Sequence, residues 1–191
     1  YDDLSELFPI LNNAGAIIIK TIDSILNMSE LQLGIYEPHF KKIDLDIDIL
    51  RYLIAEFKYS AENKKLGLNI KINTNDTEII GDSYSITQIF TNLLDNAIKY
   101  TNKGKIDVLL SRNGNNRLVA EVCDTGIGIS EDFIKKMFIP FSQEHQGYTR
   151  QYDGNGLGLA LIKNYCKINK AEIKVDSKKN EGSVFRVIFN Q

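Results

Sequence analysis

The fold is decided by one stretch of the chain, Asn92-Leu-Leu-Asp-Asn96-Ala-Ile-Lys99-Tyr100-Thr101. It lies in a predicted helix over residues 83–100, in which apolar side chains recur three and four residues apart. At 3.6 residues per turn, one side of this helix carries Gln88, Asn92, Asn96 and Lys99. The opposite side carries Ile86, Phe90, Leu93 and Ala97, which are predicted to face the core.

The polar side of this helix contains two asparagines four residues apart, Asn92 and Asn96. Asparagine is a mediocre helix former, so the pair contributes nothing to the stability of the helix. A carboxamide oxygen is a neutral hard ligand that suits a Mg²⁺ ion already shared with phosphates. A solvated surface is the ordinary alternative for such a face, but the two asparagines favour a binding function.

A carboxylate followed by two glycines forms the second motif, Asp124-Thr-Gly126-Ile-Gly128, directly after a predicted strand over residues 117–124. A fixed carboxylate accepts a hydrogen bond from the exocyclic amine of adenine, whereas the carbonyl group of guanine would oppose it. The two glycines allow the backbone to approach a base and a sugar closely. The alternative is an ordinary turn, because Asp-Thr-Gly is common turn chemistry.

Three glycines form the third motif, Gly154-Asn-Gly156-Leu-Gly158, at the start of a predicted helix over residues 157–169. The free amides of a helix N-terminus provide a natural seat for phosphate. The motif does not follow a strand within a βαβ unit, which argues against a Rossmann site. No Gly-Lys-Ser or Gly-Lys-Thr ending occurs in the chain, which excludes a P-loop.

The polar segment between residues 142 and 153 is predicted to be a lid, because a stretch of this length without periodicity is usually a lid or disordered. The sequence Phe138-Ile-Pro-Phe141 precedes it, and its two aromatic rings are expected to anchor the segment to the domain. His145 lies within this segment and is interpreted as an exposed residue rather than a catalyst.

The rest of the chain predicts a helix over residues 4–33, a second over 46–65, and strands over 68–72, 105–111, 172–176 and 183–189. Helices and strands mix without regular βαβ alternation, so we expect a helix layer on a mostly antiparallel sheet. The first helix carries a wide apolar stripe that needs a partner, and a dimer is favoured over an isolated helix. Pro9 is expected to begin or kink this helix.

The order and wording of the motifs resemble the ATP-binding catalytic domain of sensor histidine kinases, which has the Bergerat-type fold. This resemblance implies an α+β protein, a two-layer α/β sandwich whose mixed, mostly antiparallel sheet carries helices on one face. A long helix precedes it. The implied domains are 1–36, similar to the second helix of the dimerisation and phosphotransfer hairpin, a linker at 37–42, and the catalytic domain at 43–191.

The resemblance also assigns roles to residues of this chain. It implies that Asn96 binds Mg²⁺, that Asn92 orders the surroundings of the metal, and that Lys99 contacts phosphate. Arg150 resembles a lid arginine that meets the terminal phosphate, with a solvated surface arginine as the alternative. The implied catalytic residues are therefore Asn92, Lys99 and Arg150. The implied ATP-binding residues are Asn92, Asn96, Lys99, Tyr100, Asp124, Gly126, Gly128, Ile129, Phe141, Gly154, Gly156, Leu157, Gly158 and Leu159.

The chain departs from the family at several positions. Related ATPases place a water-activating glutamate where this chain has Asn92, and an amide cannot accept a proton, so very slow hydrolysis is expected. No His-Glu or His-Asp box is present, and His39 lies beside a proline in the predicted linker, so we expect the acceptor histidine to be missing from this chain. The turn Asn169-Lys-Ala171 and the ending Asn190-Gln191 are expected to change only local geometry.

Composition limits the remaining possibilities. The net charge of -2 and pI near 5.8 give no reason to expect nucleic acid as a partner. No apolar run approaches the roughly 20 residues that span a bilayer, and Cys123 and Cys166 have no metal-ligand or disulfide spacing. A soluble, cytoplasmic chain is therefore expected, while the full-length protein remains open to a membrane anchor. The resemblance implies a response-regulator receiver domain and a second copy of the protein as partners.

Two other functions remain as alternatives. One is a different enzyme of the same fold, either a serine kinase of the anti-sigma-factor type or a slow ATPase. The other is a domain that binds nucleotide without transferring phosphate. The long apolar helix before the linker favours the histidine kinase, and the presence of Asn96, Asp124 and the three downstream glycines argues against a degenerate domain.

Overall fold

The computed structural model describes residues 2–144 and 154–190. The chain divides into two compact units, Tyr1–Glu37 and Pro38–Gln191. The first unit is built on helix α1 (Asp2–Leu33), which begins before Pro9 and continues through it, so the helix does not start at the proline. Apolar side chains along α1 remain exposed, among them Leu11, Ile18, Ile22 and Ile25. No helix of the described part of the chain has the length and apolar character needed to cross a membrane.

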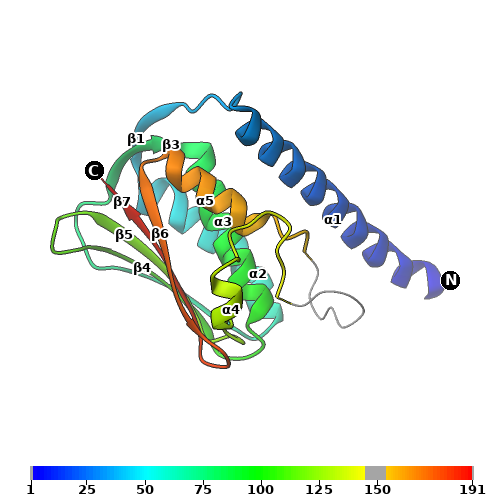
Figure 1. The fold of residues 1–191 in the computed structure, drawn as a ribbon. Coiled ribbons are helices and arrows are strands. Elements are labelled where there is room, and N and C mark those ends of the chain that lie inside the picture. Colours follow the sequence, from blue (N-terminus) through cyan, green and yellow to red (C-terminus); the bar gives the residue numbers. More distant parts are fainter. Residues whose placement is uncertain (1, 145–153, 191) are drawn as a thin grey trace. The chain divides into compact units, whose positions relative to one another are not determined.

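The second unit is a five-stranded sheet with helices on one face, as the sequence predicted (Figure 1). The strand order is β2 (Gly67–Ile72), β4 (Lys105–Arg112), β5 (Leu118–Asp124), β7 (Gly182–Phe189) and β6 (Ala171–Lys178). Strands β2 and β4 are parallel, and all other neighbours in this sheet are antiparallel. The sheet is therefore mixed and mostly antiparallel.

The helix layer consists of α2 (Arg51–Asn63), α3 (Ser83–Tyr100), the short α4 (Glu131–Ile134) and α5 (Gly158–Ile168) (Figure 1). The predicted bounds of α3 are confirmed, and its predicted core side chains Ile86, Phe90, Leu93 and Ala97 are all buried. These side chains supply much of the apolar area between helix and sheet. Packing on this side fixes which face of α3 remains available for polar contacts.

Helix α2 differs from its predicted form at both ends. It is preceded by a π-helical segment, η1 (Leu45–Leu50), and it ends at Asn63, followed by the cap Lys64 and by Lys65, which has a left-handed φ of 57°. The amide of Leu66 bonds to the carbonyl of Ala61, and the amide of Lys65 bonds to Glu62, which is the Schellman pattern. The left-handed position of this motif is thus occupied by Lys65 and not by a glycine, and Gly67 already belongs to β2.

A small second sheet was not predicted from the sequence. Strands β1 (Phe40–Asp44) and β3 (Glu78–Asp82) pair antiparallel, with Phe40 opposite Asp82 and Asp44 opposite Glu78. The expected linker at 37–42 is therefore shorter, because its last three residues belong to β1. Strand β1 has five residues and buries only Ile43, and the sequence of β3, Glu-Ile-Ile-Gly-Asp, does not alternate between polar and apolar residues, so neither strand was recognised in the sequence.

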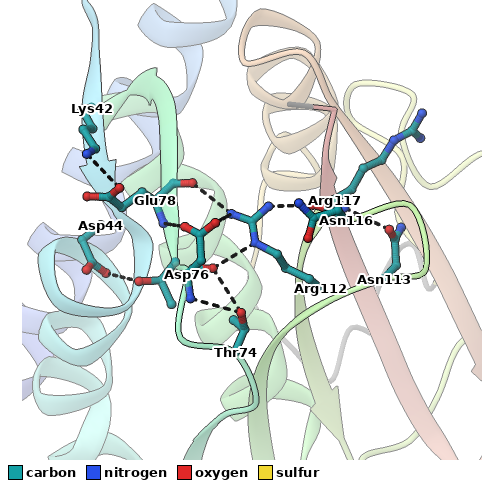
Figure 2. Close-up of polar contacts among 10 residues, drawn as sticks. Lys42, Asp44, Thr74, Asp76, Glu78, Arg112, Asn113, Asn116 and Arg117 are labelled. Carbon is teal, nitrogen blue, oxygen red and sulfur yellow. Dashed lines mark hydrogen bonds and ion pairs between the residues drawn. The ribbon is translucent and has the colours of Figure 1, made fainter.

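Arg112 connects the small sheet to the hairpin between β4 and β5 (Figure 2). Its guanidinium group lies 2.8 Å from the Asp76 carboxylate and donates to the carbonyl oxygens of Asp76 and, at 2.6 Å, Asn116. On the other side of the small sheet, Lys42 pairs with Glu78 at 2.8 Å. The charges of this network are matched to one another, so we interpret it as structural.

The structure corrects the expectation that the turn beginning at Asn169 changes only local geometry. Its side chain is 1% exposed, and its oxygen accepts the amide of Asp82 at 2.8 Å. Its amide group donates to the Ser85 hydroxyl at 2.8 Å and to the Tyr165 carbonyl at 2.9 Å. The residue therefore joins the C-terminal end of α5 to the N-terminal end of α3, which is more than a change in local turn geometry.

Candidate functional site

The polar side of α3 meets the start of α5 at Asn92. The amide group of its half-buried side chain donates to the Gln88 carbonyl at 2.8 Å, which fixes the orientation of the group. The oxygen then faces α5, where a Cβ atom at Gly158 would lie only 3.0 Å from it. Position 158 therefore has little room for a side chain. Leu157, directly before it, is fully buried, and Leu159, directly after it, is half-buried.

Lys99 extends from the last turn of α3 to the second glycine loop. Its ammonium nitrogen would lie 2.9 Å from a Cβ atom at Gly154. The same nitrogen is 4.8 Å from the centre of the Tyr100 ring, a cation–π distance. Asn96 is half-buried one helical turn before Tyr100, and among the described residues its side chain has no hydrogen-bond partner. The Lys99 ammonium group thus lies next to the Gly154 backbone, and Asn96 lies less than one turn before Lys99 on the same helix.

The loop after β5 packs against the same end of α3. The Gly126 amide donates to the Asp124 carboxylate at 2.8 Å, and the Ile127 amide donates to the Tyr100 carbonyl at 3.1 Å. A Cβ atom at Gly126 would lie 2.5 Å from the Tyr100 carbonyl oxygen, so no side chain fits there. The backbone of Tyr100 therefore connects the asparagine-bearing helix to the carboxylate loop.

The Asp124 side chain is partly buried. Burial raises the pKa of its carboxyl group, while hydrogen bonds from Gly126 and from Ser183 act in the opposite direction. Ser183 lies opposite Asp124 in the pairing of β5 with β7. It was missed in the sequence because a serine in a strand carries no signal of its own, and only the sheet register brings it to the carboxylate.

Gly128 makes a close backbone contact that was not predicted from the sequence. Its φ is 62°, and a Cβ atom there would lie 1.9 Å from the Lys178 carbonyl oxygen in the turn between β6 and β7. The Asn180 amide of that turn donates to the Ile127 carbonyl at 2.7 Å. The amide of half-buried Ile129 donates to the Ser177 hydroxyl at 2.8 Å. The absence of a side chain at Gly128 therefore allows the hairpin to hold the loop.

The two ends of the predicted lid are joined to each other. The Phe141 amide donates to the Gly156 carbonyl at 3.0 Å, and the side-chain amide of Gln143 donates to the Gly154 carbonyl at 2.7 Å. Gly156 has φ of 73°, and a Cβ atom there would lie 2.7 Å from the Phe141 backbone. Gln143 had not been singled out in the sequence. Arg150 and His145, between these ends, lie outside the described residues.

The structure thus brings Asn92 to Gly158, Lys99 to Gly154 and Tyr100 to the loop that follows Asp124. Three motifs separated in sequence meet along one side of α3. No cluster of three or more His, Cys, Asp or Glu side chains suited to a metal is found in the described ranges. The amide oxygens of Asn92 and Asn96 on α3 are of a type that Mg²⁺ accepts together with phosphate oxygens.

Comparison with known proteins agrees with this arrangement. The family model of histidine kinase-, DNA gyrase B- and HSP90-like ATPases matches residues 81–191. An uncharacterised sensor-like histidine kinase of Rhizobium meliloti is 30% identical, over 97% of this chain and 35% of its own length. The autoinducer 2 sensor kinase/phosphatase LuxQ of Vibrio parahaemolyticus is 32% identical, over 93% of this chain and 21% of its own length.

A solved structure shows the same fold. Full-length ShkA in complex with AMPPNP superposes with a TM-score of 0.81 at 22% identity, over 93% of this chain and 36% of ShkA. The chain spans about a third or less of the two curated relatives and of ShkA.

Proposed function

The chain belongs to the family of histidine kinase-, DNA gyrase B- and HSP90-like ATPases, and from this premise we propose that it holds Mg²⁺-ATP for transfer of the γ-phosphoryl group. It is an ATP-binding catalytic domain of the sensor histidine kinase type. The observation that carries the proposal is the convergence of both glycine loops on α3, at Asn92, Lys99 and Tyr100. The nucleotide would bind along this side of the helix.

Each proposed role follows from the chemistry of the side chain. The Asn96 oxygen would bind Mg²⁺ together with phosphate oxygens, and Lys99 would neutralise phosphate charge beside Gly154. Asn92 would order the groups around the metal, and Arg150 would add a further positive charge. Phosphoryl transfer depends mainly on alignment and charge neutralisation, so these groups suffice without a catalytic base in the domain.

Asp124 would select adenine. A carboxylate held by Gly126 and Ser183 keeps one direction, and it accepts a hydrogen bond from an exocyclic amine but not from a carbonyl group. Tyr100 would pack beside the nucleoside. The remaining positions, Ile129, Phe141, Leu157 and Leu159, would contribute apolar contacts at the margins of the pocket.

The proposal includes the histidine that accepts the phosphate and the proteins that interact with this chain. We propose that the phosphate passes to a histidine outside these 191 residues and then to a response-regulator receiver domain. Helix α1 would be the second helix of a dimerisation hairpin, because its exposed apolar side chains would be buried against another helix or a second copy of the chain. The sensor and kinase names of the relatives support this scheme.

Titration calorimetry with ATP and GTP, with and without Mg²⁺, tests the site directly. Asp124→Asn should weaken ATP binding by about tenfold or more, since a hydrogen bond to a charged group contributes roughly 1.5–3 kcal/mol. Asn96→Ala should remove the dependence on Mg²⁺ while leaving binding in its absence nearly unchanged. Matched controls are Asp132→Asn on exposed α4 and Asn115→Ala in the β4–β5 hairpin, both of which should bind like the wild type.

The outcome also separates the alternatives. If both site variants bind ATP as the wild type does, the proposed pocket is wrong. A second outcome is that ATP binds as expected and yet is hydrolysed at the rate of a dedicated ATPase. In that case the expectation that Asn92 keeps hydrolysis slow is wrong, and the chain is an ATPase of the same fold.

A further inference from the structure

Lys64, at the C-terminal end of α2, binds the C-terminal turn of α3. Its ammonium group donates to the carbonyl oxygens of Ile98 at 2.7 Å, Lys99 at 3.1 Å and Thr101 at 3.3 Å. Helix α3 ends at Tyr100 and is capped by Thr101, so the carbonyls of residues 98–101 lie beyond the reach of the amides of a following helical turn. The remaining one of this set, Tyr100, accepts the Ile127 amide. A single side chain from another helix thus satisfies most of this terminus.

The position of Lys64 is fixed by its own backbone. The left-handed residue Lys65 and the two Schellman bonds end α2 directly at Lys64 and set the direction in which its side chain leaves the chain. Lys65 carries the same charge one residue further on, but among the described residues its side chain makes no hydrogen bond or ion pair. The contact with α3 is therefore specific to Lys64.

The helix turn that Lys64 binds would repel the phosphates of a nucleotide beside it if Lys64 were absent. The C-terminus of a helix carries a negative partial charge of roughly half an elementary charge, which repels phosphates and favours cations. The proposed phosphate ligand Lys99 belongs to this same turn. An ammonium group seated on the terminal carbonyls reverses the sign of the local field.

We propose, on the premise of the nucleotide site described above, that Lys64 is a positioning residue that neutralises the end of α3 so that the phosphate chain of ATP binds beside it. Lys64 does not touch the nucleotide. It acts through the carbonyls of Ile98, Lys99 and Thr101, and so it affects the triphosphate more than the nucleoside.

The test compares ATP with adenosine on the complete chain. Lys64→Met and Lys64→Gln should weaken ATP binding by about fivefold, the upper end of the effect of one charge at an exposed helix terminus, with adenosine affinity changed by less than about twofold. Lys64→Gln retains a donor without the charge, so equal losses in both variants identify charge as the cause. Lys64→Arg should restore ATP binding, because guanidinium also donates to carbonyls.

Lys65→Met is the matched control, since it removes the same charge from the neighbouring position and should bind ATP like the wild type. Equal weakening of ATP and adenosine together with a lower Tm would make Lys64 a merely structural residue and overturn the proposal. Unchanged ATP binding in Lys64→Gln, or the same loss in Lys65→Met, would overturn it as well. Failure of the nucleotide site itself would be recognised separately, because Asp124→Asn and Asn96→Ala would then have no effect in the same assay.

Discussion

At the scale of the residue, Asp124 shows a conflict between stability and function. Partial burial disfavours its charged form, and the hydrogen bonds from Gly126 and Ser183 only partly offset this, so its pKa is raised. An asparagine would remove the desolvation cost, but its neutral amide oxygen would be a weaker acceptor for the amine of adenine than a carboxylate is. On the proposal that Asp124 binds the exocyclic amine of adenine, ligand recognition would account for a carboxylate at this half-buried position.

This conflict predicts a pH dependence of stability. The folded state binds the Asp124 proton more tightly than the unfolded state, whose carboxyl group titrates near 3.8. As the pH rises from that value through the raised pKa, the wild type should lose stability relative to Asp124→Asn, because the native state then binds more protons than the unfolded one. Tm of both proteins without nucleotide, measured at several pH values from about 4 to 7, checks the prediction.

Asp132→Asn is the control, because that carboxylate is exposed on α4. Its Tm difference from the wild type should show no comparable drift with pH. A Tm difference between the wild type and Asp124→Asn that stays constant over the whole pH range would contradict a raised pKa.

At the scale of the element, α3 is held at both ends by residues from other helices. Its N-cap is Asp82, whose carboxylate accepts the Ser85 amide at 2.9 Å, and Asn169 from the end of α5 binds both of these residues. Lys64 from α2 binds the other end. The polar side of α3 is therefore positioned by contacts outside the site.

Truncation of Asn169 should destabilise the domain without removing the site. Asn169→Ala leaves the buried Asp82 amide without its acceptor, which costs about 1–3 kcal/mol and should lower Tm clearly. ATP affinity should stay within about twofold of the wild-type value, since the Asn169 contacts lie at the opposite end of α3 from Lys99. Unfolding is expected to remain two-state, so the Tm values can be compared. Thermal unfolding and calorimetry of the same sample provide both readouts.

Asn164→Ala is the matched control on α5, because the Asn164 side chain donates to the Ala160 carbonyl of its own helix and to no other group in the described part of the chain. It should change Tm much less than Asn169→Ala. A loss of ATP binding in Asn169→Ala at temperatures where it is fully folded would show that the two ends of α3 are coupled, contrary to this expectation.

At the scale of the whole molecule, helices cover one face of the sheet (Figure 1). Both glycine loops contact α3, where we propose that the nucleotide binds. The first unit, with α1, is a separate body. We propose that the second unit binds ATP and that the acceptor histidine lies outside these 191 residues.

Incubation of the 191-residue chain with [γ-³²P]ATP should therefore leave the nucleotide largely intact and the protein unlabelled. Asn92 cannot activate water, so phosphate release should be far slower than about 1 s⁻¹, the lower end of typical turnover numbers. Acid-labile label on this chain alone would show that one of its own histidines accepts phosphate. Rapid phosphate release would show that another group activates water.

The sequence by itself determined the bounds of α3, its buried face, the strands of the large sheet and the residue types of the three motifs. These follow from periodicity and from the special backbone of glycine, which are local properties of the chain. Only the tertiary structure decided that Gly128 accommodates Lys178, that Ser183 reaches Asp124, and that Lys64 closes the end of α3. Each of these contacts joins residues that are far apart in the chain, and strand register and helix packing bring them together without leaving a pattern in either segment.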